Sequence, residues 1–234
     1  MLDATRLLRP GLLDGVTIVL AYSALAERPF SSAIGAACEG LGARVCGCRL
    51  PAGAAPGDDR TAPAQDPVEA AVERTLAEAG APHMLVVDGA SLFLIRGRGG
   101  EGVPEQARSA LRECLEASWS VTQALAKHAL LTDGTREGAG GRIVFLAPPS
   151  RAGVSSSQEE GEHEHTDAAR AGLENLARTL SIEWARHAIT TVAIAPRIGA
   201  QAAGEVAALT AYLASPAGAY FSGCLLDLTG PAST

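Results

Sequence analysis

The feature that most constrains this chain is the alternation of short apolar runs with segments of helical periodicity. Six runs have the length of buried strands: residues 16–21, 43–50, 83–87, 142–146, 189–194 and 223–228. Helical patterns lie between them, at residues 32–41, 67–78, 105–130, 168–187 and 204–214. Strands that alternate with helices form parallel sheets, whose strands are buried on both faces. The sequence therefore predicts an α/β fold with a doubly wound parallel sheet of about seven strands.

Length and composition favour one domain over the whole chain. The 234 residues are 47% hydrophobic, and no linker or internal repeat divides them. Only 4% are aromatic, so the core must consist mainly of Ala, Val, Leu and Ile. We therefore predict a single Rossmann-like domain, residues 1–234, with helices on both faces of its sheet.

Charge and apolar pattern argue against several function classes. The net charge is −7 and the Lys and Arg residues are scattered, which is unfavourable for nucleic-acid binding. No apolar run reaches the roughly 18 residues of a membrane span, and the first residues lack the layout of a secretion signal. The five cysteines are odd in number and lack C-x-x-C spacing, which disfavours disulfides and structural zinc. We expect a cytoplasmic protein without a nucleic-acid or membrane partner.

One segment has the composition of a metal site. In residues 159–167, His163 and His165 alternate with carboxylates. A metal site also needs ligands anchored on rigid elements, whereas acidic runs are typical of solvated loops. We interpret the segment as a solvated acidic loop and expect no metal, with divalent-ion binding as the alternative.

Four segments carry a pattern that is known from one enzyme family. They are Gly140 to Val144, Ala171 to Ala185, Ile189 to Pro196, and Leu213 to Gly230. In this order they resemble four parts of the short-chain dehydrogenase/reductases, especially the 3-oxoacyl-carrier-protein reductases and 3-hydroxyacyl-CoA dehydrogenases. Those parts are the entry to the serine-bearing strand, the catalytic helix, the strand after it and the C-terminal ending. The resemblance covers nearly the whole chain and implies the family's NAD(P)-binding fold.

The segment after the first strand lacks the glycines of the family's T-G-x-x-x-G-I-G turn. Residues 21–34 contain no glycine, and Gly35 lies inside the expected helix. Matching Ile34 to the family's helix start puts residues 29–31 in the turn, where their side chains would fill the space of a pyrophosphate. We interpret the segment as an ordinary strand-to-helix loop and expect no cofactor in this chain.

The remaining positions that match the family's cofactor contacts are vestigial: Arg28, Ser31, Arg49, Asp88 and Gly89. Arg28 and Ser31, together with Ser32, leave open the alternative of a different phosphate cradle. Arg49 is near the end of the second strand, where a basic residue suits NADP. Asp88 and Gly89 stand where the family has N-N-A-G, and Asp88 also suits a turn cap.

The family's catalytic Asn, Ser, Tyr and Lys positions are occupied here by Cys114, Pro148, Thr166 and Arg170. A catalytic tyrosine, with an ordinary pKa of about 10, needs a nearby cation to act near neutrality. Thr166 cannot donate a proton at pH 7, and the guanidinium of Arg170 differs from a lysine amine in geometry. The resemblance therefore implies that all four roles are vacant, unless Ser150 or His165 substitutes.

Other parts of the chain indicate assembly. In the family, helices that correspond to residues 105–130 and 166–187 pack against the same helices of a second subunit. The second of them keeps apolar positions here: Leu173, Leu176, Leu180, Ile182 and Trp184. Residues 197–204 pass almost directly into the next helix, which leaves nothing to form a lid over a substrate.

The resemblance implies a catalytically inactive subunit that pairs with an active homologous subunit in a hetero-tetramer or other oligomer. That complex would act on an acyl-CoA or related hydroxy or oxo substrate, with NAD or NADP bound by the partner. Two alternatives remain open. One is an active NAD(P)-dependent oxidoreductase with an atypical site, and the other is a homo-oligomeric binding protein.

Overall fold

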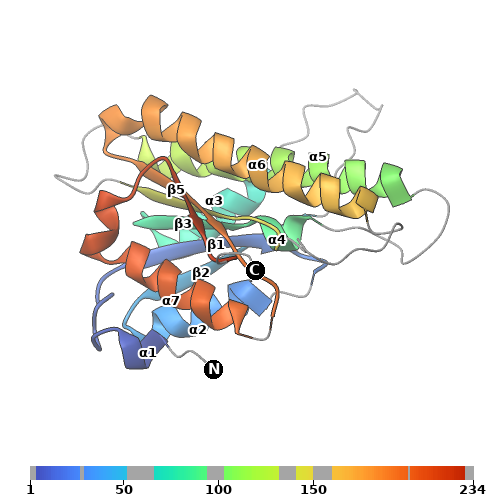
Figure 1. Ribbon diagram of the computed structural model, residues 1–234. Coiled ribbons are helices and arrows are strands. Elements are labelled where there is room, and N and C mark those ends of the chain that lie inside the picture. Colours follow the sequence, from blue (N-terminus) through green and yellow to red (C-terminus); the bar gives the residue numbers. More distant parts are fainter. Residues whose placement is uncertain are drawn as a thin grey trace.

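Six parallel strands form the centre of the computed structural model (Figure 1). The structure describes residues 4–26, 29–51, 66–93, 103–131, 141–149, 160–199 and 201–229. The strands are β1 (Thr17–Ser23), β2 (Arg44–Leu50), β3 (Met84–Asp88), β4 (Arg142–Leu146), β5 (Thr190–Ala195) and β6 (Cys224–Asp227). Their order is β2-β1-β3-β4-β5-β6, so the expected doubly wound sheet is confirmed with six described strands rather than about seven.

Helices cover both faces of the sheet (Figure 1). One face carries α1 (Ala4–Leu7), α2 (Pro29–Gly40) and α7 (Ala202–Ala214), and the other carries α3 (Pro67–Ala79), α5 (Val103–Leu125) and α6 (Glu160–Glu183). The short α4 (Gly89–Leu92) follows β3, and a π-helical turn, η1 (Ala126–Leu130), continues α5. Two 3₁₀ turns, η2 (Ala185–His187) and η3 (Pro216–Tyr220), follow α6 and α7. Among the described helices, none combines the length and apolarity needed to cross a bilayer.

Each strand contributes to two separate cores because successive side chains point to opposite faces of a sheet. In β4, Ile143 and Phe145 join the core under α3, α5 and α6. Val144 and Leu146 join the core under α2 and α7. This double burial explains why the strands appear in the sequence as continuous apolar runs.

Two local expectations were wrong. Residues 160–167, expected to be part of a solvated loop, are the first two turns of α6. Acidic side chains are favourable at a helix N-terminus because the helix dipole is positive there. Pro29 also begins α2, so residues 29–31 lie in its first turn rather than in a loop before it. Proline suits a first turn because its φ is fixed and its missing N–H would be unpaired there anyway.

Candidate functional site

A buried carboxylate joins the carboxyl ends of β1 and β3 to the first turn of α2. Asp88 ends β3 and is only 1% exposed. Its carboxylate accepts hydrogen bonds from the Ser31 hydroxyl and from the backbone N–H groups of Ser31, Ala90 and Ser91. The Ser91 hydroxyl donates to the Asp88 carbonyl oxygen at 2.8 Å and accepts from the Ser23 N–H at 3.1 Å. The vestigial positions Ser31 and Asp88 are therefore in direct contact.

At this junction the N-terminal end of α2 binds the side chain of Asp88. Burial raises the pKa of Asp88, and the hydrogen bonds from Ser31, Ser91 and Ala90 act in the opposite direction. Ordinarily the first N–H groups of a helix, with the positive end of its dipole, can bind a phosphate. Here the hydroxyl and N–H of Ser31 are directed at Asp88. Asp88 also caps α4 by accepting from the Ser91 N–H at 3.0 Å, which confirms its expected role as a turn cap.

The other cofactor positions are dispersed or serve packing. Arg49 is exposed on the edge strand β2, and Arg28 lies outside the described residues. Gly89 begins α4, where an added Cβ would lie 2.7 Å from both the Leu146 carbonyl oxygen and the Leu173 Cδ1. This glycine is therefore needed for close packing of α4 against β4 and α6.

Arg170 links the ends of three strands. Its Nη1 donates to the carbonyl oxygens of Pro148 at 3.2 Å and Pro196 at 3.4 Å, just beyond β4 and β5. Its Nη2 lies 3.9 Å from Oδ1 of Asp227, the last residue of β6. The side chain is 14% exposed. Hydrogen bonds from Thr229 lower the pKa of Asp227, and the charge of Arg170 lowers it further.

The other positions that the resemblance matches to catalytic residues are Cys114, Pro148 and Thr166. Cys114 is buried against the Gly89 carbonyl oxygen at 3.4 Å, and burial raises the pKa of its thiol to about 12. Pro148 is buried just after β4, and Thr166 is half-buried on α6, one turn before Arg170. His165 is half-buried on the same helix, while Ser150 lies outside the described residues. The three tyrosines of the chain lie in other elements, β1, α7 and η3.

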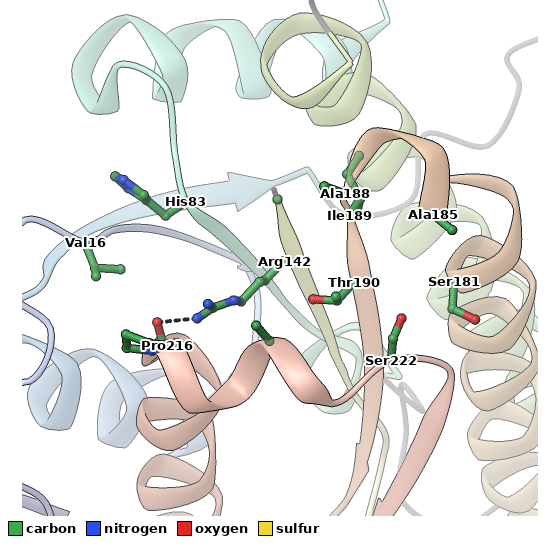
Figure 2. A pocket seen from close by; sticks show the side chains of 13 residues that line it. Val16, His83, Arg142, Ser181, Ala185, Ala188, Ile189, Thr190, Pro216 and Ser222 are labelled. Carbon is green, nitrogen blue, oxygen red and sulfur yellow. Dashed lines mark hydrogen bonds between the residues drawn. The ribbon is translucent and has the colours of Figure 1, made fainter. Parts of the chain in front are cut away.

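A pocket of about 620 Å³ lies at the opposite, amino-terminal edge of the sheet. Figure 2 shows Arg142, His83, Thr190 and Ser222 around it. Arg142 Nη1 donates to the carbonyl oxygens of residues 213–215 at 2.5–2.9 Å, which caps the C-terminal end of α7. His83 Nδ1 accepts the backbone N–H of Thr17 at 3.0 Å. These polar groups hold neighbouring elements together, and no sequence motif indicated the pocket.

The structure also brings together three possible metal ligands that the sequence analysis missed. Glu69 and Glu73 on α3 and His128 in η1 place their ligand atoms within 4.8 Å of one another. The i, i+4 spacing of the two glutamates is visible in the sequence. The third ligand is 55 or more residues away, in a turn that has no local sequence signal.

The strand order and the helices on both faces define a Rossmann-like fold. No family model and no curated protein matches the chain. Solved structures do match. The citronellol catabolism dehydrogenase of Pseudomonas aeruginosa has a TM-score of 0.68 and 25% identity, covering 97% of this chain and 98% of that one. The 3-ketoacyl-(acyl-carrier-protein) reductase of Brucella melitensis, solved with NADH, has a TM-score of 0.69 and 21% identity, with coverages of 95% and 100%.

A short-chain dehydrogenase/reductase of Serratia marcescens has a TM-score of 0.65 and 20% identity, with coverages of 92% and 96%. These similarities extend over nearly the full length of each chain at low sequence identity. The fold of this chain is therefore that of the short-chain dehydrogenase/reductases.

Proposed function

We propose that this protein is a degenerate short-chain dehydrogenase/reductase: a catalytically inactive subunit that assembles with an active homologous subunit. The substrate class we assign to the complex is an acyl-CoA or related hydroxy or oxo compound, with NAD or NADP bound by the partner. The observation that carries the proposal is the buried Asp88 carboxylate bound to the first turn of α2.

The residues at this edge do not fit a dinucleotide. The Ser31 hydroxyl and N–H, which a pyrophosphate would need at the start of α2, are bound to Asp88. A phosphate at this position would have to take the Ser31 hydroxyl and N–H from Asp88 and leave a buried carboxyl group without these hydrogen bonds, which costs about 1–3 kcal/mol. Phe30, which is 9% exposed, lies in the first turn of α2 and packs into the core beneath α2 and α7, so the helix begins here without a glycine turn.

The proton-transfer positions support the same conclusion. A threonine at position 166 has no acidity near pH 7, and Arg170 directs its guanidinium to two carbonyl oxygens and a carboxylate. The side chain that would activate a catalytic tyrosine in the family thus holds β4, β5 and β6 together here.

Exposed apolar side chains support assembly. Trp119 on α5 is 39% exposed and Ile182 on α6 is 79% exposed. Ala168, Ala171 and Thr179 are exposed along the same helix, so a partner helix can approach it closely. Tyr220, in the turn before β6, is 91% exposed. Both regions correspond to subunit interfaces of the family that the chain resembles.

Two measurements test the proposal. In the first, the purified chain is titrated with NADH and NADPH, and we expect no saturable binding. In the second, the tagged chain is recovered from its native source, and we expect an associated homologue that contains an intact Tyr-x-x-x-Lys motif and carries the activity.

The recovery experiment has a matched pair of variants. I182E should release the homologue. I198E should not, because Ile198, which is 52% exposed, lies between β5 and α7 and not on the proposed interface helices. Micromolar NAD(P)H binding with turnover by the isolated chain would overturn the proposal in favour of an active oxidoreductase. Self-association without a homologue would favour a homo-oligomeric binding protein.

A further inference from the structure

A second cluster of chemically active side chains lies where α3 packs against the end of α5. Glu69 and Glu73 are one helical turn apart on α3, and His128 faces them from η1. His128 Nε2 is 3.0 Å from Glu69 Oε1 and 4.0 Å from Glu73 Oε1. The side chains are between 29% and 46% exposed, so the cluster can be reached from solvent.

From this geometry we infer that Glu69, Glu73 and His128 form a binding site for a divalent transition-metal ion of the Zn²⁺ class. Imidazole nitrogen and carboxylate oxygen bind Zn²⁺ at about 2.0–2.2 Å, so neighbouring ligands of a tetrahedral ion lie about 3.3–3.6 Å apart. The two distances from His128, 3.0 and 4.0 Å, lie on either side of this range, and small rotations of the glutamate side chains bring all three ligand atoms into it. An imidazole ligand also favours Zn²⁺ over Mg²⁺ and Ca²⁺, which prefer oxygen ligands only.

The backbone around His128 gives an independent reason to assign a function to this region. Residues 126–130 form a π-helical turn at the end of an otherwise regular α-helix. Such turns are rare and occur frequently at functional sites. The wider turn changes the direction of His128 from that of a continuous α-helix, and in this direction it contacts α3.

A lysine pairs with one of the two carboxylates of the cluster. Lys127 Nζ lies 2.8 Å from Glu69 Oε1, and its side chain is 67% exposed. The exposed ammonium can move into solvent when an ion binds. Removing it should therefore strengthen metal binding.

The cluster borders a pocket that contains both tryptophans of the chain. Glu69 and Lys127 line this pocket, which measures about 500 Å³, together with Trp119 and Trp184. Three protein ligands leave coordination positions open, as in zinc sites that bind water or a small ligand. A paramagnetic ion at the cluster would quench tryptophan fluorescence, so metal binding can be measured by the intrinsic fluorescence of the protein.

The experiment uses the full chain after treatment with a chelator. We expect calorimetry to show one Zn²⁺ per chain, and Co²⁺ or Ni²⁺ to quench the tryptophan fluorescence with the same stoichiometry. H128Q and E73Q should each weaken binding at least tenfold, and K127M should strengthen it several-fold. E78Q, at another exposed glutamate of α3, is the matched control and should leave binding unchanged.

Thermal unfolding of each variant without metal shows whether it is folded, and half-exposed positions such as these tolerate the substitutions. If no metal ion binds even at millimolar metal concentrations, the inference is overturned. So would binding that survives H128Q and E73Q but is lost in H165Q, because the ion would then be bound by the acidic start of α6. Neither outcome bears on the proposed loss of dinucleotide binding, since the two sites share no residue.

Discussion

Replacing Arg170 by methionine tests whether this side chain is structural. If Arg170 is a clamp between strand ends, R170M should lower the free energy of unfolding. If Arg170 instead serves a catalytic role, the substitution should change a reaction rate and leave the free energy of unfolding nearly unchanged. Methionine keeps the length and apolar stem of arginine, so the change removes mainly the guanidinium.

The expected loss follows from three contacts. Hydrogen bonds from charged donors contribute about 1.5–3 kcal/mol each, but those to Pro148 and Pro196 are long, at 3.2 and 3.4 Å, so we assign about 1 kcal/mol to each. Asp227 is 3.9 Å away with a side chain that is 49% exposed, and solvent limits its contribution to a few tenths of a kcal/mol. The total is about 2–2.5 kcal/mol. For a chain of this length it corresponds to a fall in Tm of about 4–10 °C.

Urea unfolding followed by circular dichroism measures this loss, and differential scanning calorimetry gives the Tm. R178M is the matched control on the same helix, because Arg178 is 60% exposed and forms only an i, i+4 pair with Glu174. We expect the control to change stability by less than about 0.5 kcal/mol. Equal stabilities for R170M and R178M would refute the assignment of Arg170 as a structural clamp.

Three further predictions concern packing, the Asp88 junction and the thiols. G89A should cost about 1–3 kcal/mol because the new Cβ meets a backbone carbonyl, whereas G172A meets only the flexible end of Leu115 and should be nearly neutral; chemical denaturation compares them. S31A removes a hydroxyl donor from a buried carboxylate and should lower stability by about 1–3 kcal/mol in the same assay, without creating NADH binding. Burial raises the pKa values of Cys38 and Cys114 to about 12, so both thiols should resist thiol reagents in the native protein at pH 8. Because the folded state keeps these protons after the unfolded chain has lost them, stability should fall as the pH rises from about 9 toward 12. This fall should be smaller in a variant with alanine at both positions.

The sheet could be predicted from the sequence because its signal is local. The four central strands, β1, β3, β4 and β5, are buried on both faces, so their residues form nearly uninterrupted apolar runs, and residues 142–146 were predicted with the bounds of β4. The acidic start of α6 was missed for a physical reason. Residues 160–167 have the composition of a solvated loop, but they continue a long helix whose dipole favours acidic side chains at that end.

The candidate site was less predictable because its contacts join distant segments. The lack of glycine after β1 and the residue types at positions 114, 148, 166 and 170 are visible in the sequence. The bond between Ser31 and Asp88 connects residues 57 apart, and no pattern in either segment indicates it. The sequence analysis anticipated only the capping role of Asp88. In the same way, the contacts of Arg170 with Pro148 and Pro196 require the register of β4 beside β5, which only the folded sheet provides.

The proposed loss of the dinucleotide cradle and the proposed loss of the proton donor involve different residues, and this leads to a last prediction. The double variant T166Y/R170K recreates the family's Tyr-x-x-x-Lys pair on α6. We expect no NAD(P)H-dependent turnover from it, because the Ser31 hydroxyl and N–H at the start of α2 still bind Asp88. We also expect lower stability than in the starting protein, since one lysine amine replaces a guanidinium whose Nη1 binds two carbonyl oxygens while its Nη2 faces Asp227. Fluorescence titration with NADH and a 3-oxoacyl reductase assay measure binding and turnover. Measurable reduction by this variant would show that the α2 turn accepts a dinucleotide. The lack of a proton donor would then be the sole cause of the proposed inactivity.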